Sequence, residues 1–124
     1  MKQKVHSVSY LAKAEFEFKN GVYDLVALPT GAEVVKVSLE IVGGNHTIDG
    51  SVNVGFKDEL QKNYFLALDN ISKNFLSSLT SNKDYTATSN KVVVAEVSNT
   101  NGNDNVKGVL RVLYFLPSVI EVEY

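Results

Sequence analysis

Hydrophobic and polar residues alternate along several separate stretches of the chain. In residues 13–19 three apolar side chains alternate with charged ones, and Glu33–Val42 and Ser51–Phe56 repeat the pattern with many β-branched residues. A period of two residues is typical of strands that bury one face and expose the other. We expect the inward residues of these stretches and of a later one to share one core: Val35, Val37, Leu39, Ile41, Val52, Val54, Leu110, Val112 and Tyr114.

Residues that favour tight turns separate the alternating stretches. Asn20 and Gly21 suit the left-handed backbone angles of a hairpin turn. A run of Asn, Gly and Asp spans Asn99–Asn105, and we interpret it as the loop of a hairpin that joins Lys91–Ser98 to Gly108–Leu116. Turns spaced this closely between short strands predict an all-β sandwich or barrel, which we expect to contain about seven to nine strands.

The stretch Lys57–Asn82 has no single clear period. Residues near Asn63–Leu68 suit a strand or a turn, and a loop follows. Four apolar residues around and after Asp69 also fit the spacing of one short helix, with Asp69 as its N-cap. These residues are Leu68, Ile71, Phe75 and Leu79.

Two predicted strands are apolar on both faces. Gly108–Leu116 places core residues on one face, and its other face also becomes apolar toward the end of the strand. In another strand, Val92, Val93 and Val94 are consecutive, so apolar side chains lie on both faces. In a small sandwich the second layer covers only one face of each sheet, so the other face needs a partner or a covering loop. We expect either an interface between copies of the chain or cover by Lys57–Asn82. The interface residues would be Val109, Arg111, Leu113 and Phe115.

The two ends of the chain differ from the middle. Residues 1–12 show no sustained alternation, and alone they bury too little apolar surface to order. We therefore expect an extended N-terminal arm over residues 1–12, followed by the sandwich over residues 13–124. Such an arm either is disordered or orders against a partner by adding a strand to an exposed edge. Its apolar contact residues would be Val5, Val8, Tyr10 and Leu11. Val119–Tyr124 alternates and predicts a strand.

Composition and charge narrow the possible partners. The 124 residues suffice for one domain, and there is no cysteine for a disulfide or a thiolate metal site. The net charge is -2, and acidic and basic residues are interspersed along the chain, so the sequence contains no basic cluster that would bind nucleic acid. No apolar run approaches the length of a membrane span. We therefore expect neither nucleic acid nor a membrane as a partner.

The residues that could carry chemistry do not form a known catalytic pattern. His6 and His46 are the only imidazoles, neither has a carboxylate at ligand spacing, and no nucleophile elbow is present. Two glutamate pairs could in principle act as the paired carboxylates of a glycoside hydrolase. However, Glu15 and Glu17 alternate with apolar residues, as does the C-terminal glutamate pair, so both pairs suit the solvent-exposed face of a strand. We expect no enzyme, no metal and no cofactor.

The order of motifs resembles a family of small bacteriophage head proteins, the capsid decoration or cement proteins. The resemblance covers about residues 22–116, and the loop after Gly55 is longer than in that pattern. The residues at the two ends are additional. The motifs that carry the resemblance are Leu28-Pro29-Thr30-Gly31-Ala32, Val34–Val42, Asn53-Val54-Gly55, Phe65-Leu66-Ala67-Leu68-Asp69, Tyr85-Thr86-Ala87 and Lys91–Leu116.

The resemblance implies a jelly-roll-like antiparallel β-sandwich that decorates a phage capsid, commonly as a homotrimer. It implies a place in the virion on the outer surface of the capsid, contact with the major capsid protein, and synthesis in the host cytoplasm. A phage tail or baseplate accessory, or a receptor- or carbohydrate-binding β module, is the alternative.

Overall fold

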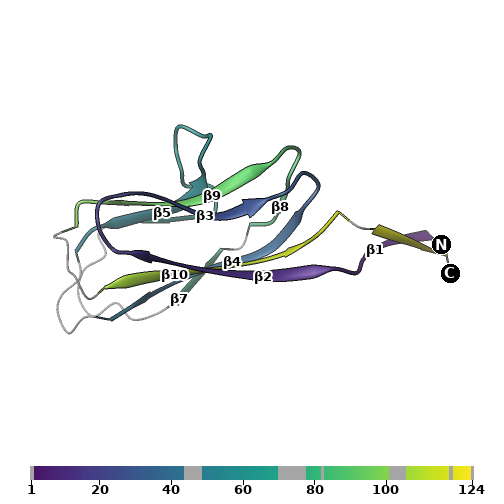
Figure 1. Cartoon of the computed structure of the whole chain (residues 1–124), viewed down its shortest axis with the longest axis horizontal. Helices are drawn as coiled ribbons and strands as arrows, with labels where there is room; N and C mark the ends of the chain where they lie inside the picture. Colours follow the sequence, from purple (N-terminus) through teal and green to yellow (C-terminus); the bar gives the residue numbers. More distant parts are fainter. Residues whose placement is uncertain are drawn as a thin grey trace.

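The computed structural model describes residues 2–43, 49–69, 78–81, 83–100, 106–117 and 119–123. Two antiparallel sheets face each other, and a two-stranded ribbon projects from one end of the pair (Figure 1). The described residues contain strands and no helix, so the predicted all-β sandwich is confirmed. The helix considered within Lys57–Asn82 falls largely on residues 70–77, which lie outside the described residues.

Each sheet is built from strands that are far apart in the sequence. The β10 sheet has the order β2 (Ser9–Glu17), β10 (Lys107–Phe115), β4 (Glu33–Val42) and β7 (Ser78–Ser81), and β8 (Tyr85–Thr86) also pairs with β4. The β9 sheet has the order β3 (Gly21–Leu28), β9 (Lys91–Ser98), β5 (Ser51–Phe56) and β6 (Leu66–Leu68). The ribbon pairs β1 (Lys2–His6) with β11 (Val119–Glu123).

The core lies between the two sheets, where the alternating stretches predicted it. All but one of the expected core residues are buried in the same cluster, which also contains Phe18, Phe56 and Phe65. Val35 is the exception, because 48% of its surface is exposed while Val34 is fully buried. The expectation for Val35 was wrong.

A β-bulge explains the exposed valine. Along β10, Leu113 is the partner of Lys36 and Tyr114 is the partner of Val34, so Val35 is the additional residue in β4. An additional residue inverts the alternation of a strand on one side of the bulge. The inward positions are therefore Val37 and the alternate residues after it, but Val34 before it.

The proposed hairpin between Lys91–Ser98 and Gly108–Leu116 was also wrong. Strand β9 pairs with β3 and β5, whereas β10 pairs with β2 and β4. The segment between β9 and β10 therefore crosses from one sheet to the other. A run of turn-forming residues predicts a change of direction, but it does not reveal whether the next strand pairs with the previous one.

The ends of the chain meet in the ribbon. Lys2 is the register partner of Glu123, and Lys4 is the register partner of Glu121. Strand β2 begins at Ser9, so the last part of the expected arm lies in the sandwich. The backbone NH of Leu116 donates to the carbonyl oxygen of Val8 at 2.8 Å, which ties the base of the ribbon together.

We expect Gly108→Ala to destabilise the fold. Gly108 is the register partner of Phe16, and a Cβ atom there would lie 2.2 Å from Cζ of the Phe16 ring. That ring is buried and stacks on Tyr23, so it has little room to move. Overpacking of this kind costs about 1–3 kcal/mol, measurable as a lower urea midpoint. Adding Phe16→Leu should recover part of the loss, and an unchanged midpoint for Gly108→Ala would contradict the packing described.

Candidate interaction surfaces

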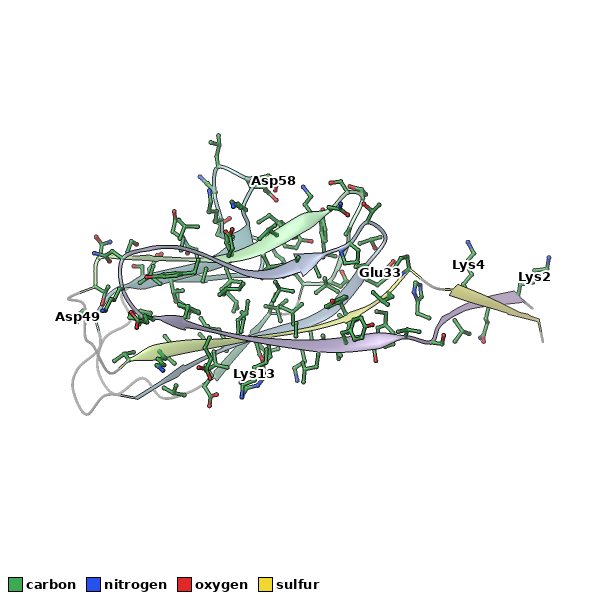
Figure 2. All side chains as sticks on the ribbon, viewed as in Figure 1. Lys2, Lys4, Lys13, Glu33, Asp49 and Asp58 are labelled. Atoms are coloured by element: carbon green, nitrogen blue, oxygen red, sulfur yellow. The ribbon has the colours of Figure 1, made fainter. Side chains whose placement is uncertain are left out.

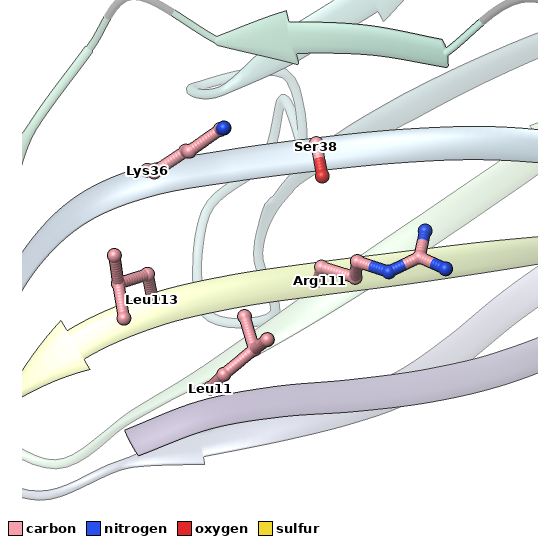
Figure 3. Close-up of a pocket in the computed structure, with 5 residues that line it drawn as sticks. All are labelled: Leu11, Lys36, Ser38, Arg111 and Leu113. Atoms are coloured by element: carbon pink, nitrogen blue, oxygen red, sulfur yellow. The ribbon is translucent and has the colours of Figure 1, made fainter. Parts of the chain in front are cut away.

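The outer face of the β10 sheet carries an open hollow of about 240 Å³. Leu11 of β2 and Leu113 of β10 are register partners and form its apolar part, as Figure 3 shows. Lys36 and Ser38 of β4, with Arg111 of β10, complete the lining. Leu11 is 63% exposed, so this hollow is an apolar surface that the single chain leaves open.

Basic side chains surround the apolar part of this hollow. Lys36 is exposed, and the register places Lys13 opposite Arg111 on the same face. Nη1 of Arg111 donates to Oε1 of Glu40 at 3.2 Å, which directs the guanidinium along the strand. Both side chains are about one-third exposed, so this ion pair contributes little to stability. The hollow is therefore suited to an apolar side chain that has an acidic neighbour.

A second hollow, of about 290 Å³, lies where the ribbon joins the β10 sheet. It is lined by His6, Glu33, Val35 and Phe115. Nδ1 of His6 lies 3.1 Å from the carbonyl oxygen of Leu116, and the His6 ring meets the edge of Phe115. The exposed Val35 of the bulge thus continues the apolar surface toward the ribbon.

The structure brings together residues that the sequence assigned to different surfaces. Leu11, expected in the arm, pairs with Leu113, expected in an interface between copies. Tyr10 lies on the other face of β2, with its ring 5.8 Å from that of Tyr114. Val109 is only 4% exposed and is therefore buried within the single chain.

The remaining expected residues divide between the ribbon and the sheet. Val5 lies in β1, Val8 lies between β1 and β2, and both are exposed. Arg111 and Phe115 are partly exposed on the outer face of β10. The alternation of the sequence placed Lys36 on the outer face, as observed, but it assigned Val35 to the core, because the bulge that turns Val35 outward is not visible in the local pattern.

The loop between β5 and β6 forms a further surface. The sequence indicated only that this loop is long. It rises from the outer face of the β9 sheet, with Asp58 near its outer end (Figures 1 and 2). Val94 is fully buried although it lies outside the core cluster. A Cβ atom on its register partner Gly55 would meet the backbone of Lys62, so the loop packs directly onto β5 and covers this face.

An ion pair joins the loop to β9. Nζ of Lys91 donates to Oδ2 of Asp58 at 2.7 Å. This hydrogen bond holds the pKa of Asp58 below its ordinary value and the pKa of Lys91 above its ordinary value. The stabilisation is therefore present above the ordinary pKa of aspartic acid, about 3.9, and below that of lysine, about 10.4.

We expect Asp58→Asn to lower the melting temperature slightly at pH 7 and to change it less near pH 3. The carboxylate of the unchanged chain accepts from Lys91 at pH 7, and it loses this charge as the pH falls through its lowered pKa. Melting curves of both chains at the two pH values measure the difference. An equal difference at both pH values would show that the ion pair does not stabilise the loop.

The described residues contain no group of three or more His, Asp or Glu side chains that could hold a metal ion. Within the same residues, no helix is long and apolar enough to cross a membrane. The described part of the chain offers several surfaces for binding, among them the two hollows, the ribbon and the β5–β6 loop.

Comparison with known proteins identifies the group to which this fold belongs. No protein-family profile and no curated protein sequence matches the chain. Among solved structures, it is 73% identical to a chain in the acidic stable capsid structure of Helicobacter pylori bacteriophage KHP30, with a TM-score of 0.92 and 100% of both chains covered.

Two more distant capsid structures share the fold. One is the capsid asymmetric unit of cyanophage Pam1, at 21% identity and a TM-score of 0.70, covering 88% of this chain and 85% of that one. The other is the capsid of Ralstonia phage GP4, at 12% identity and a TM-score of 0.59, covering 92% and 88%. The full-length identity to the KHP30 chain confirms the resemblance seen in the sequence: the chain belongs to a family of small β-sandwich proteins of bacteriophage capsids.

Proposed function

We propose that the chain is a non-enzymatic decoration protein that binds the outer surface of a phage capsid and stabilises its shell of major capsid protein. The observation that carries this proposal is the 73% identity, over the full length of both chains, to a chain of a phage capsid structure. A phage structural role follows from that likeness, and decoration is the form of it that best fits a small chain with open surfaces.

The strand order supports the same conclusion. Most successive strands of the chain lie in opposite sheets, which gives the orders β2-β10-β4-β7 and β3-β9-β5-β6. These orders support assignment of the sandwich as a jelly roll, a pair of Greek keys found in viral capsid domains. We infer that the sandwich serves as a rigid support for contact surfaces, because a decoration protein needs no reaction chemistry.

The ribbon is the part that we propose to contact the shell. An isolated two-stranded ribbon is only marginally stable in water. Strand β1 is exposed along most of its length and projects beyond the sandwich, where Lys2 and Lys4 are labelled in Figure 2. A shell surface that packs on Val5 and Val8, or adds a strand beside β1, would supply the missing layer.

The outer face of the β10 sheet is the part that we propose for self-association as a homotrimer. Its open apolar residues are Leu11, Leu113, Val35 and Phe115, with Arg111 beside them. Three copies that bind together gain avidity of about 10²–10⁴ over one copy, which suits a protein with several weak shell contacts.

Adding the purified chain back to capsids that lack it tests the proposal. The chain should co-sediment with capsids up to a fixed number of copies and raise their resistance to heat. Purified tails of the same phage and glycan arrays serve as the comparison. Binding to tails or glycans without binding to capsids would favour a tail accessory or a receptor-binding module instead.

A further inference from the structure

The β5–β6 loop presents one apolar side chain entirely to solvent. Leu60 is 102% exposed, so its side chain contributes nothing to the core of its own chain. Asp58 and Glu59 precede it, and both are exposed as well. The outer part of the loop therefore combines a leucine with two acidic neighbours.

The loop holds this leucine in a defined position. Nζ of Lys57 donates to Oδ2 of Asp24 at 2.7 Å, and Lys91 holds Asp58 on the other side. Nζ of Lys62 donates to the carbonyl oxygen of Glu59 at 2.9 Å, within the loop. A contact made by a segment that is already ordered loses less conformational entropy on binding. The bracing thus favours the use of Leu60 as a contact residue.

The hollow of the β10 sheet has complementary chemistry. Leu11 and Leu113 supply an apolar surface, and Lys36 stands at its side. Its volume of about 240 Å³ exceeds the roughly 150 Å³ that holds a benzene molecule in a protein interior. A leucine side chain therefore fits, and its acidic neighbour would meet the basic side chains of the hollow.

The loop and the hollow cannot meet within one chain. The loop rises from the β9 sheet, and the hollow lies on the outer face of the β10 sheet, as the opposed positions of Asp58 and Lys13 in Figure 2 show. A contact between them joins two different patches of two copies. Contacts of this heterologous kind close into a ring, such as a trimer, when the rotation between copies allows it, and otherwise extend into an open stack.

We infer that Leu60 of one copy inserts between Leu11 and Leu113 of a second copy, with Glu59 beside Lys36. This inference rests on the self-association in the proposed function and names the residues that make it. It assigns the long β5–β6 loop to contact between copies and leaves the ribbon for the shell.

Cysteine cross-linking tests the contact, because the chain has no cysteine of its own. A Leu60→Cys chain is mixed with a Leu11→Cys chain under mild oxidation, both in solution and on decorated capsids. We expect a disulfide-linked dimer in the mixture that far exceeds the product of either chain alone. Replacing the Leu11→Cys chain by Val22→Cys, also exposed but on β3, should give little product. Absence of the specific dimer in both settings would overturn the inference.

Charge reversal gives an independent measurement of the same contact. Glu59→Lys and Lys36→Glu should each weaken self-association in sedimentation experiments, and the chain with both changes should recover it. Failure of the double variant to recover would contradict the pairing. If the chain binds capsids but gives no cross-link, only this inference is overturned. If the chain cross-links but never binds capsids, the proposed function is overturned.

Discussion

Val37→Asp is expected to abolish soluble folding of the chain. Val37 is fully buried in the core, opposite Val112 of β10. A carboxylate placed there has no partner, and an uncompensated buried charge costs about 3–5 kcal/mol. Domains of this size are stable by only about 5–15 kcal/mol in total, so the loss removes much of the stability. Soluble yield and a circular dichroism melt measure the outcome.

Val35→Asp is the matched control in the same strand. The residue type, the substitution and the strand are the same, but the bulge turns this valine outward. We expect this variant to fold with a melting temperature close to that of the unchanged chain. Equal damage from both substitutions would show that Val35 belongs to the core and that the bulge is absent.

Removal of the ribbon is expected to abolish capsid binding without unfolding the sandwich. A chain limited to residues 8–117 keeps the hydrogen bond between Val8 and Leu116 and every strand of both sheets. Its melting temperature should therefore change little. Binding to undecorated capsids should be lost at concentrations that saturate the full chain, because the proposed shell contacts lie on the ribbon.

A point variant tests whether the exposed side chains of the ribbon make the capsid contact, without removing the ribbon. Val5→Asp should weaken capsid binding at least about tenfold, which corresponds to a loss of roughly 1.4 kcal/mol in the binding free energy. Val22→Asp, at a similarly exposed valine in β3, should leave binding unchanged. Full occupancy of capsids by the chain that lacks the ribbon would exclude the ribbon as the anchor.

Most of the strands could be predicted from the sequence because one face of each is buried. Alternation located β4 and β5 within their observed bounds, and the turn-forming run after Ser98 helped to place β9 within its bounds and β10 within one residue. The inversion at Val35 could not be predicted, since a bulge depends on how β4 pairs with β10 rather than on local pattern. The pairing of β9 and β10 with different strands was likewise hidden, because alternation reports burial and not neighbours.

The candidate surfaces could be predicted only in part from the sequence. The apolar outer face of β10 pointed to Leu113 and Phe115, but it also pointed to Val109, which the structure buries although the local alternation does not distinguish it from the other two. Leu11 and Leu113 share a hollow only because β2 pairs with β10, which the sequence did not reveal. Leu60 is a lone leucine in a polar loop, and only its full exposure in the structure distinguishes it from a core residue.

Cryo-electron microscopy of the native phage particle tests the central claim most directly. We expect density for this sandwich on the outer surface of the head, in repeated copies, with the β1–β11 ribbon against the major capsid protein. Heads without such density, in particles whose copies of this chain lie in the tail or inside the shell, would contradict it.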